Sequence, residues 1–500
     1  MLKKILATLF LYVASNPAFA SFDESIDSAM APVSKAAASV IFVSVPIGGM
    51  DVPVIILWLM AIGIFSSFYF GFINLRYFGL SLQLLGGKYQ KKDREGEISN
   101  WEALSTSLSG TVGLGNIAGV AVAVSVGGPS ATVWMILMGF LGMSTKFLEC
   151  ALGVKYRIIN EEGVASGGPM YYIDRGLTDR GWPKLGKILA VFFAVCCIGG
   201  ALGGGNMFQA NQTFQMYLRV AGEASFLADK AWLFGIGLAV LTGAAIIGGI
   251  KSIAHVAEVI FPLMAGIYLL IGLYIIGANI EHLPAALNSI FGGLFTSEAA
   301  FGGILGALIA GVKRAVFSNE SGCGSAAITY GAVKSDSHIS QGLIAMLNPF
   351  IDTVCICTLT ALVIAVTGVY TEGGGMEGVA LTARAFATAG EWTKYWLGLT
   401  VFLFAYSTLI SWYYLGEKAF TYLAGRSSAT LYGFKIFYCL CVVVGAAAKL
   451  SNIIDFTDAL FFAMAIPNVI ILYMMAPEIK RDLKAYIEDL KAKKASEKAG

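Results

Sequence analysis

The sequence is poor in charge. Only 13% of its 500 residues are Asp, Glu, Lys or Arg, whereas 57% are hydrophobic. A soluble domain has roughly 25% charged residues, so this chain has too few charges to cover a water-facing surface of its size. The polar residues gather between apolar runs of about 20 residues, the length that crosses a hydrocarbon core of ~30 Å as a helix. We therefore expect an all-α polytopic membrane protein.

Metal-ligating residues are scarce and scattered. The three histidines, His255, His282 and His338, lie far apart, which argues against a catalytic metal held by histidines. Most of the eight cysteines lie inside apolar runs, where cysteine acts as a small hydrophobic residue. The net charge is +2, and the Lys and Arg residues lie in short loops and at the C-terminus. No basic face for nucleic acid is therefore expected.

The N-terminus is typical of a secretory signal peptide. Two lysines precede an apolar stretch from Ile5 to Ala14, and Ala18-Phe19-Ala20 supplies the small-x-small cleavage pattern. A short first membrane anchor is the alternative. We expect a signal peptide over residues 1–20 and an exported segment over residues 21–50.

Apolar segments and loop charges predict the topology. Spans are expected near residues 53–75, 102–126, 128–152, 187–217, 231–249, 253–277, 301–332, 341–368, 394–415, 431–448 and 456–476. Residues 76–94 carry five basic residues and residues 155–187 carry six, whereas residues 278–300 carry none. Because basic loops stay in the cytoplasm, we expect an exported N-terminus and a cytoplasmic C-terminus. The tail after residue 477 is expected to form a short amphipathic helix on the inner leaflet.

Two of these segments are interrupted at mid-span by polar, glycine-rich sequence. The first helix break is expected within Ser109-Gly110-Thr111-Val-Gly113-Leu-Gly115-Asn116, and the second within Phe317-Ser318-Asn319-Glu320-Ser321-Gly322-Cys-Gly324. Gly costs ~1 kcal/mol against Ala in a helix, and free backbone groups are costly in lipid. Breaks therefore persist where a bound ion or substrate, or another partner, takes up the released N–H and C=O groups.

The two breaks resemble each other. Ser109 and Ser318, Gly113 and Gly322, and Gly115 and Gly324 are each 209 residues apart. The second interrupted segment is the fifth span after the first, so the second copy has the opposite orientation, as in the inverted repeats of transporters. Chance is the alternative, since the chain has 59 glycines. Half-helix N-termini suit a carboxylate, and released carbonyls with Ser or Thr hydroxyls suit sodium.

Other polar residues at membrane depth are functional candidates. Their alternative role is hydrogen bonding between helices, worth ~0.6 kcal/mol on average. For Asn211 and Asp352 both roles stay open. Glu320 is expected to hold N–H groups of the second break rather than a cation. Trp412 is either a pocket wall or an interfacial aromatic residue, and its position one turn after Thr408 favours the wall.

Several motifs together resemble the alanine/glycine:cation symporter family. They are Ser109-Gly-Thr-Val-Gly-Leu-Gly-Asn-Ile-Ala-Gly-Val-Ala121, Gly127-Gly-Pro129, Trp134-Met135, Lys146-Phe-Leu-Glu149, Lys155-Tyr-Arg157, Gly167-Gly-Pro-Met-Tyr-Tyr172, Gln209-Ala-Asn211, Lys313-Arg-Ala-Val-Phe-Ser-Asn-Glu320 and Trp412-Tyr-Tyr414. The resemblance runs in order from about residue 53 to residue 476. Ser130 and Cys323 depart from the family pattern, which bears on fine selectivity.

The resemblance implies a leucine-transporter-like (APC) fold of five plus five helices in an inverted repeat, behind one extra N-terminal helix. Residues 51–100 then hold the extra transmembrane helix and a cytoplasmic loop, residues 101–300 the first repeat, residues 301–476 the second, and residues 477–500 a charged cytoplasmic tail. The implied function is sodium symport of alanine, or of glycine, by alternating access across the bacterial inner membrane, with sodium as coupling ion and no organic cofactor. We expect a monomer in the lipid bilayer, with no nucleic-acid partner.

The resemblance also assigns residues. Those implied to bind the substrate are Ser109, Gly110, Thr111, Gln209, Phe317, Ser318, Asn319 and Trp412. Those implied to bind sodium are Thr111, Gly113, Ser407 and Thr408. From their positions in the two breaks, and not from the resemblance, the residues expected to support the unwound segments are Gly115, Asn116, Glu320, Gly322 and Gly324.

Two other classes of protein were weighed. An intramembrane enzyme would need a catalytic pair, for which Asp352, Glu320 and Glu149 are the candidates at depth, but no nucleophile–base pair is evident. A sensor built on a transporter fold would need an extra domain, and the tail is only about 24 residues long. Alanine and glycine, L and D enantiomers, and sodium and proton coupling stay open as alternatives.

Overall fold

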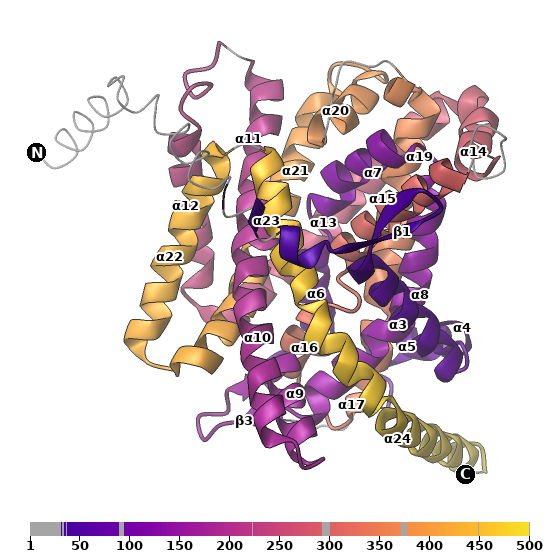
Figure 1. Cartoon of the computed structure of the whole chain (residues 1–500), viewed down its shortest axis with the longest axis vertical. Coiled ribbons are helices and arrows are strands. Elements are labelled where there is room, and N and C mark those ends of the chain that lie inside the picture. The colour runs from indigo at the N-terminus through magenta and orange to yellow at the C-terminus, as the bar shows by residue number, and fades with distance from the viewer. Residues whose placement is uncertain are drawn as a thin grey trace, which may run out of the picture.

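Helices make up nearly all of the structure (Figure 1). The computed structural model describes residues 38–89, 95–222, 224–292, 301–371, 378–448 and 450–499, together with residues 32, 35 and 36. The expected signal peptide over residues 1–20 lies outside the described residues. The buried apolar side chains form one large core cluster that draws on nearly every helix from α3 (Val54–Tyr69) to α24 (Ala465–Ala499).

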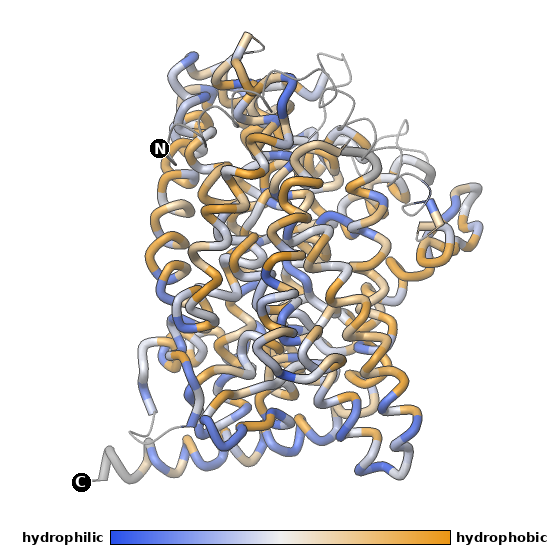
Figure 2. The backbone as a smooth tube through the Cα atoms, turned by 90° about the vertical axis from the view of Figure 1, so that its left-hand side faces the viewer, coloured by the Kyte–Doolittle hydropathy of each residue, from blue (hydrophilic) through white to orange (hydrophobic). Residues whose placement is uncertain are grey.

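Seven of the described helices are long and apolar enough to cross a membrane, and a bent pair makes an eighth. The seven are Ala131–Lys155, Pro183–Ala221, Gly249–Ala278, His338–Thr367, Thr393–Ala424, Ser428–Ala447 and Ile453–Lys493, and the bent pair is Asn100–Thr111 with Gly115–Gly127. Two shorter apolar helices, Val54–Tyr69 and Ala231–Ile246, match other predicted spans. Figure 2 shows these long apolar stretches running side by side, with polar residues concentrated toward the ends of the bundle. A multi-span membrane protein is confirmed, and the count of eleven spans stays a prediction.

In chain order, the helices before the second break are α3, α4 (Ile73–Arg76), α5 (Phe78–Leu85), α6 (Asn100–Thr111), η2 (Gly115–Gly119), α7 (Val120–Gly127), α8 (Ala131–Lys155), α9 (Pro169–Thr178), α10 (Pro183–Leu202), η3 (Gly203–Met207), α11 (Phe208–Ala221), α12 (Ala231–Ile246), α13 (Gly249–Ala278), η4 (Ile280–His282), α14 (Leu283–Phe291) and α15 (Phe301–Asn319).

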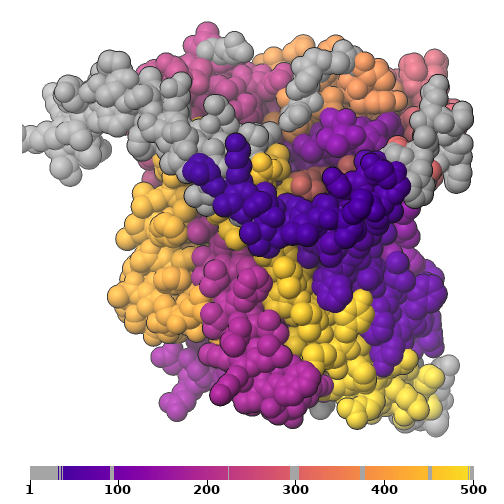
Figure 3. All heavy atoms as spheres, viewed as in Figure 1, coloured from indigo at the N-terminus to yellow at the C-terminus, as the bar shows by residue number. Residues whose placement is uncertain are grey.

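The helices after it are α16 (Ser325–Gly331), α17 (His338–Ala345), α18 (Leu347–Pro349), η6 (Phe350–Cys357), α19 (Thr358–Thr367), η7 (Val369–Thr371), α20 (Val379–Ala387), α21 (Thr393–Ala424), α22 (Ser428–Ala447), α23 (Leu450–Ala463) and α24. Two short antiparallel hairpins complete the described fold, β1 (Ser44–Ile47) with β2 (Met50–Pro53), and β3 (Ile158–Ile159) with β4 (Ala165–Ser166). Figure 3 shows the segment from β1 to α3 lying across the outside of the later helices.

The start of α6 is fixed by local sequence. The Ser99 side chain accepts a hydrogen bond from the Glu102 backbone N–H, and the Glu102 carboxylate accepts one from the Ser99 N–H. This reciprocal capping box satisfies two backbone donors that a helix start leaves free. It places the start of α6 firmly, so that the helix reaches mid-depth at Ser109 to Thr111.

The tail differs from the expected separate helix on the leaflet. It continues the last span as the single helix α24, and Pro477 does not interrupt it. The predicted apolar face exists, but Ile479, Leu483 and Leu490 are buried against the protein. Lys155 forms ion pairs with Glu478 (2.6 Å) and Asp482 (2.5 Å). The tail therefore packs against the end of the bundle because its apolar face finds protein there.

Candidate functional site

The first break lies where the sequence predicts it. Helix α6 ends at Thr111, residues 112–114 are not helical, and the chain resumes as the π-helix η2 before α7. The two halves are bent by 48°. Two freed N–H groups find amide side chains: Gly113 N–H donates to Asn116 Oδ1 (2.9 Å), and Leu114 N–H donates to Gln209 Oε1 (3.1 Å).

The second break lies between α15, which ends at Asn319, and α16, which begins at Ser325. Three residues in it have left-handed backbone: Glu320 (φ 60°), Gly322 (φ 93°) and Gly324 (φ 81°). That conformation costs a residue other than Gly roughly 1–2 kcal/mol, so Glu320 is held there by its surroundings. Shifted by 209 residues, positions 112–114 fall on 321–323, inside this second break.

The two breaks are neighbours in space. A Cβ atom added at Gly115 would lie 3.4 Å from the Phe317 ring and 3.6 Å from the Ser318 Cα. Glycine at position 115 thus lets the first broken helix approach the end of α15. Both predicted interruptions are present, and they lie next to each other.

A small cavity lies between the breaks. It measures about 20 Å³, space for about one water molecule. The lining residues come from both breaks and from three other segments: Gly110, Thr111, Gly113, Gly115, Gly204, Gln209, Phe317, Glu320, Thr408, Trp412 and Phe461. Five of the eight predicted substrate residues therefore face one cavity.

A released backbone carbonyl meets two hydroxyls beside this cavity. The Ser109 carbonyl, in the last turn of α6, accepts a hydrogen bond from the Thr408 hydroxyl of α21 (3.0 Å). The Ser407 hydroxyl lies 3.4 Å from the same carbonyl and 3.0 Å from the Phe404 carbonyl of its own helix. Gly113 allows this approach, because a Cβ there would collide with Thr408 Oγ1. Three buried oxygens from two helices thus converge on one point.

Three predicted site residues point their side chains elsewhere. The Thr111 hydroxyl bonds to Asn348 Oδ1 (3.2 Å) and the Ser107 carbonyl (3.2 Å). The Ser318 hydroxyl donates to Asp352 Oδ2 (2.8 Å), and Asn319 Nδ2 donates to Thr353 Oγ1 (3.0 Å). Their backbone atoms remain at the ends of the broken helices.

Asp352 connects the two breaks. Its carboxylate, on the π-helix η6, accepts hydrogen bonds from Asn116 Nδ2 (2.7 Å) and from the hydroxyls of Ser318 (2.8 Å) and Thr353 (2.7 Å). Asp352 is fully buried, so these donors replace water around its oxygens. Its surroundings favour a role at the site.

The structure decides three of the alternatives left open. Asn211 donates to the carbonyl of Ala448 (2.7 Å) and so ties helices together. Trp412 is a pocket wall, and its Nε1 donates to the Gly110 carbonyl (3.2 Å) and to Glu320 Oε1 (3.1 Å). The expectation that Glu320 holds N–H groups of its own break is wrong, because its carboxylate accepts from Trp412 and the Ser325 hydroxyl.

Two cavity residues were missed. Gly204 lies in the run Gly203-Gly204-Gly205, which forms the start of the π-helix η3. This π-helix is a further helix irregularity, and the glycine run could have indicated it. A Cβ at Gly204 would lie 3.4 Å from the Phe317 ring. The Phe461 ring lies tilted against the rings of Phe317 and Trp412. No sequence pattern distinguishes Phe461 from other core phenylalanines.

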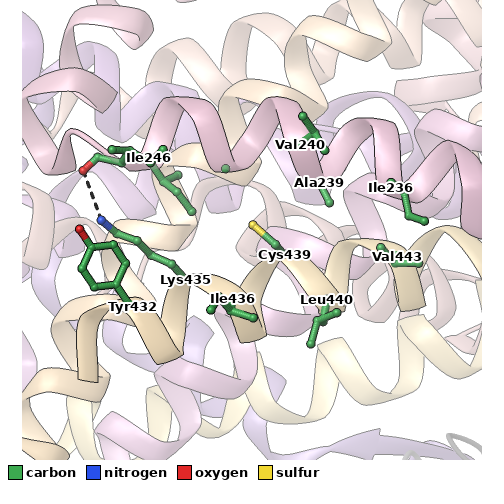
Figure 4. A pocket seen from close by; sticks show the side chains of 12 residues that line it. Ile236, Ala239, Val240, Ile246, Tyr432, Lys435, Ile436, Cys439, Leu440 and Val443 are labelled. Carbon is green, nitrogen blue, oxygen red and sulfur yellow. Dashed lines mark hydrogen bonds between the residues drawn. The ribbon is translucent and has the colours of Figure 1, made fainter. Parts of the chain in front are cut away.

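A larger groove lies elsewhere. It measures about 450 Å³, runs between α12 and α22 on the outside of the bundle, and is lined by side chains such as Ile236, Val240 and Leu440, with Lys435 at one end (Figure 4). Lys435 donates to the Ile247 carbonyl (3.2 Å). An apolar groove on two membrane-spanning helices lacks the converging polar groups of a substrate site.

Comparison with known proteins gives consistent matches over almost the whole chain. The family described as the sodium:alanine symporter family matches residues 38–499. The sodium/alanine symporter AgcS of Methanococcus maripaludis is 40% identical over 87% of this chain and 94% of its own length. An uncharacterized transporter of Haemophilus influenzae is 38% identical, with coverage of 88% and 94%. The probable sodium/glutamine symporter GlnT of Bacillus subtilis is 32% identical, with coverage of 88% and 89%.

A solved structure agrees on the fold. The crystal structure of MhsT in complex with L-phenylalanine aligns with a TM-score of 0.58 over 77% of this chain and 90% of that one, at 14% identity. The family match replaces the enzyme alternative with a transporter. The chain belongs to the sodium:alanine symporter family.

Proposed function

We propose that this protein is a symporter that uses sodium entry to import a small neutral amino acid, alanine or glycine, by alternating access. The observation that carries the proposal is the meeting of the Ser109 carbonyl with the Ser407 and Thr408 hydroxyls beside the cavity between the two breaks. The family match and the relatives' names support the same reading.

The proposed sodium site uses these converging oxygens. A carbonyl released at a half-helix C-terminus, with nearby hydroxyls, is a suitable ligand set for sodium. The Thr408 hydroxyl donates to the carbonyl, and the Ser407 hydroxyl lies next to it; on binding sodium, both hydroxyls would turn their lone pairs to the ion. Thr111 and Gly113 complete the proposed set through the backbone of the first break, which sodium would order.

The proposed substrate site lies next to it. The substrate carboxylate replaces Gln209 Oε1 as the acceptor of the Leu114 N–H. It then lies at the start of η2, the second half of the first broken helix, where free N–H groups attract anions. The substrate ammonium takes the Gly110 carbonyl and Glu320 carboxylate that Trp412 Nε1 now occupies. In this arrangement Ser109, Ser318 and Asn319 contribute through the backbone at the helix ends.

The walls favour a small substrate. Phe317, Trp412 and Phe461 enclose the cavity with aromatic rings. With room for about one water, the cavity must widen even for alanine, so binding is coupled to movement of the broken helices. A long side chain would also have to displace Trp412, which packs so closely against Gly205 that a Cβ added there would collide with the Trp412 Cβ and Cγ. The cavity and its walls therefore favour alanine or glycine over glutamine as the substrate.

We extend the proposal to topology. Residues 101–300 and 301–476 form two five-helix inverted repeats behind the extra helix in residues 51–100, with residues 21–50 exported and the tail at 477–500 in the cytoplasm. The 209-residue correspondence of the two breaks supports the repeat, and the basic loops support the orientation. The protein acts as a monomer in the inner membrane.

Uptake into proteoliposomes tests the function. Labelled alanine should accumulate only with an inward sodium gradient, and equal uptake with sodium on both sides or in choline would overturn the proposal. Unlabelled glycine, serine, D-alanine and glutamine are then added as competitors. Alanine or glycine should compete best, and glutamine competing as well as alanine would overturn the argument from the aromatic walls. A proton gradient without sodium tests the other coupling ion, and accumulation under it alone would overturn sodium coupling.

A further inference from the structure

One motif of the sequence has no part in the proposed function, Lys146-Phe-Leu-Glu149. Lys146 and Glu149 lie one turn apart on α8, and both side chains are fully buried. The Lys146 Nζ lies 3.9 Å from Glu149 Oε2, and neither atom has a hydrogen-bond partner among the described residues. Ionisable side chains at membrane depth are costly and mark functional sites.

Helix α8 places this pair directly behind the second break. A Cβ added at Gly142, one turn before Lys146, would lie 2.7 Å from Ser321 Oγ. Glu149 Oε1 accepts a hydrogen bond from Asn468 Nδ2 (2.8 Å), which also donates to the Gly322 carbonyl (2.9 Å). The carboxylate is thus linked to the backbone of the break through one amide, and it also interacts directly with the backbone of Gly322 and Gly324.

The charge of Lys146 reaches the cavity through Glu320. The ammonium interacts electrostatically with Glu149, Glu320 and Asp352, all of them buried. Lys313 and Arg314, the cations of the neighbouring α15, both pair with Asp458 instead. Glu320 is the carboxylate that lines the cavity and accepts from Trp412 Nε1.

We propose that Lys146 is a resident cation of the transport site, a positioning residue that holds the second break and, through Glu320, the Trp412 wall. A charge inside the protein is tolerated when it is paired; this ammonium lies 3.9 Å from the Glu149 carboxylate and also interacts electrostatically with Glu320 and Asp352. Because Lys146 is covalently fixed, it compensates Glu149 and Glu320 throughout the transport cycle, while sodium comes and goes at the first break. This inference rests on the proposed function.

Replacing the ammonium should therefore change substrate binding. In Lys146→Gln, Glu320 loses the compensating charge of Lys146, and the carboxylate no longer presents a fixed partner to Trp412 or to the substrate ammonium. We expect the alanine KM to rise about 10-fold with a smaller change in maximal rate. Lys146→Arg keeps the charge and should stay within about threefold of the wild-type KM.

The experiment measures sodium-driven alanine uptake in proteoliposomes at varied alanine concentration. Lys155→Gln is the matched control, because it removes a lysine from the same helix where the side chain is partly exposed and pairs with the tail. A Lys146→Gln/Glu149→Gln variant distinguishes the role of Lys146 at Glu149 from its role at Glu320. It removes the charge at position 149 together with that of Lys146, but it leaves the Glu320 carboxylate uncompensated.

Each outcome is decisive. A raised KM in Lys146→Gln and in the double variant, with Lys146→Arg near wild type, supports the proposal. A wild-type KM in Lys146→Gln, or recovery of the wild-type KM in the double variant, overturns it, since Lys146 would then serve only Glu149. If Lys146→Gln does not fold, the double and arginine variants decide by the same criteria. Absence of sodium-driven uptake by the wild-type protein overturns the proposed function instead.

Discussion

The two helix breaks solve the same backbone problem with different partners. In the first break, neutral groups that can exchange take up the freed backbone atoms: Gln209 and Asn116 accept from N–H groups, and the Thr408 hydroxyl donates to the Ser109 carbonyl. In the second, glycines in left-handed conformation turn the chain, and a buried network around Glu149 and Asn468 fixes it.

This difference separates the roles of the two breaks. Hydrogen bonds between neutral groups contribute a net ~1 kcal/mol each, so a sodium ion or a carboxylate can displace them. A buried charge that loses its partner is destabilising by about 3–5 kcal/mol, so the second network is permanent. We infer that the first break changes partners during transport and that the second is the fixed wall it moves against.

The largest effect is expected where the first break meets α21. In Gly113→Ala the new Cβ would collide with Thr408 Oγ1 and lie 3.3 Å from Gln209 Oε1. Both partners of the first break would shift, and uptake should fall roughly 100-fold or more, as misplacements of about 1 Å do at catalytic sites.

Gly119→Ala is the control for that variant. It lies in the same broken helix, but its Cβ would meet only the Arg314 Cδ at 3.8 Å, an ordinary contact. Sodium-driven uptake by Gly119→Ala should stay near wild type. Comparable uptake by the two variants would show that close approach at the first break is not required.

At the second break the expected effect is on stability. Gly324 has φ 81°, and an added Cβ would contact Pro169 Cγ and lie 3.1 Å from Asn468. Gly425 has a similar φ of 76° after α21, with nothing within 4 Å. Gly425→Ala should cost only the backbone strain, roughly 1–2 kcal/mol, whereas Gly324→Ala should cost clearly more because it also displaces the Asn468 network.

Thermal unfolding in detergent measures both variants. A lower midpoint for Gly324→Ala than for Gly425→Ala is expected. Equal midpoints would mean that the second break is held by backbone conformation alone and that its buried network contributes nothing measurable.

The sequence predicts the breaks well because their cause is local. Glycine and polar residues in an apolar run are unfavourable in a lipid-exposed helix, so Gly113 and Gly322 indicate the interruptions directly. Trp412 and Gln209 could be placed at the site by the family resemblance, and both line the cavity.

Side-chain directions could not be predicted, because they depend on which helices meet. The Ser318 and Asn319 side chains turn toward Asp352 and Thr353 of η6, a partner about 34 residues away that no spacing rule identifies. Glu320 was expected to bond its own break and instead accepts from Trp412. The tail was misjudged for the same reason, since amphipathic periodicity does not distinguish a leaflet from a protein surface.

The smallest effect separates sodium from substrate at the first break. Thr408→Ala removes one of the three converging oxygens, so the sodium concentration for half-maximal uptake should rise about 10-fold, the size expected for losing one ligand to a charge. The order of competition among alanine, glycine and serine should not change, because the aromatic walls remain.

Thr400→Ala is the matched control. Thr400 is equally buried on α21, but its hydroxyl bonds to the Trp396 carbonyl of its own helix (2.7 Å), so its removal should leave sodium dependence unchanged. A Thr408→Ala protein with wild-type sodium dependence and altered amino-acid preference would place the hydroxyl at the substrate instead, and the exchange of partners at the first break would then concern the substrate alone.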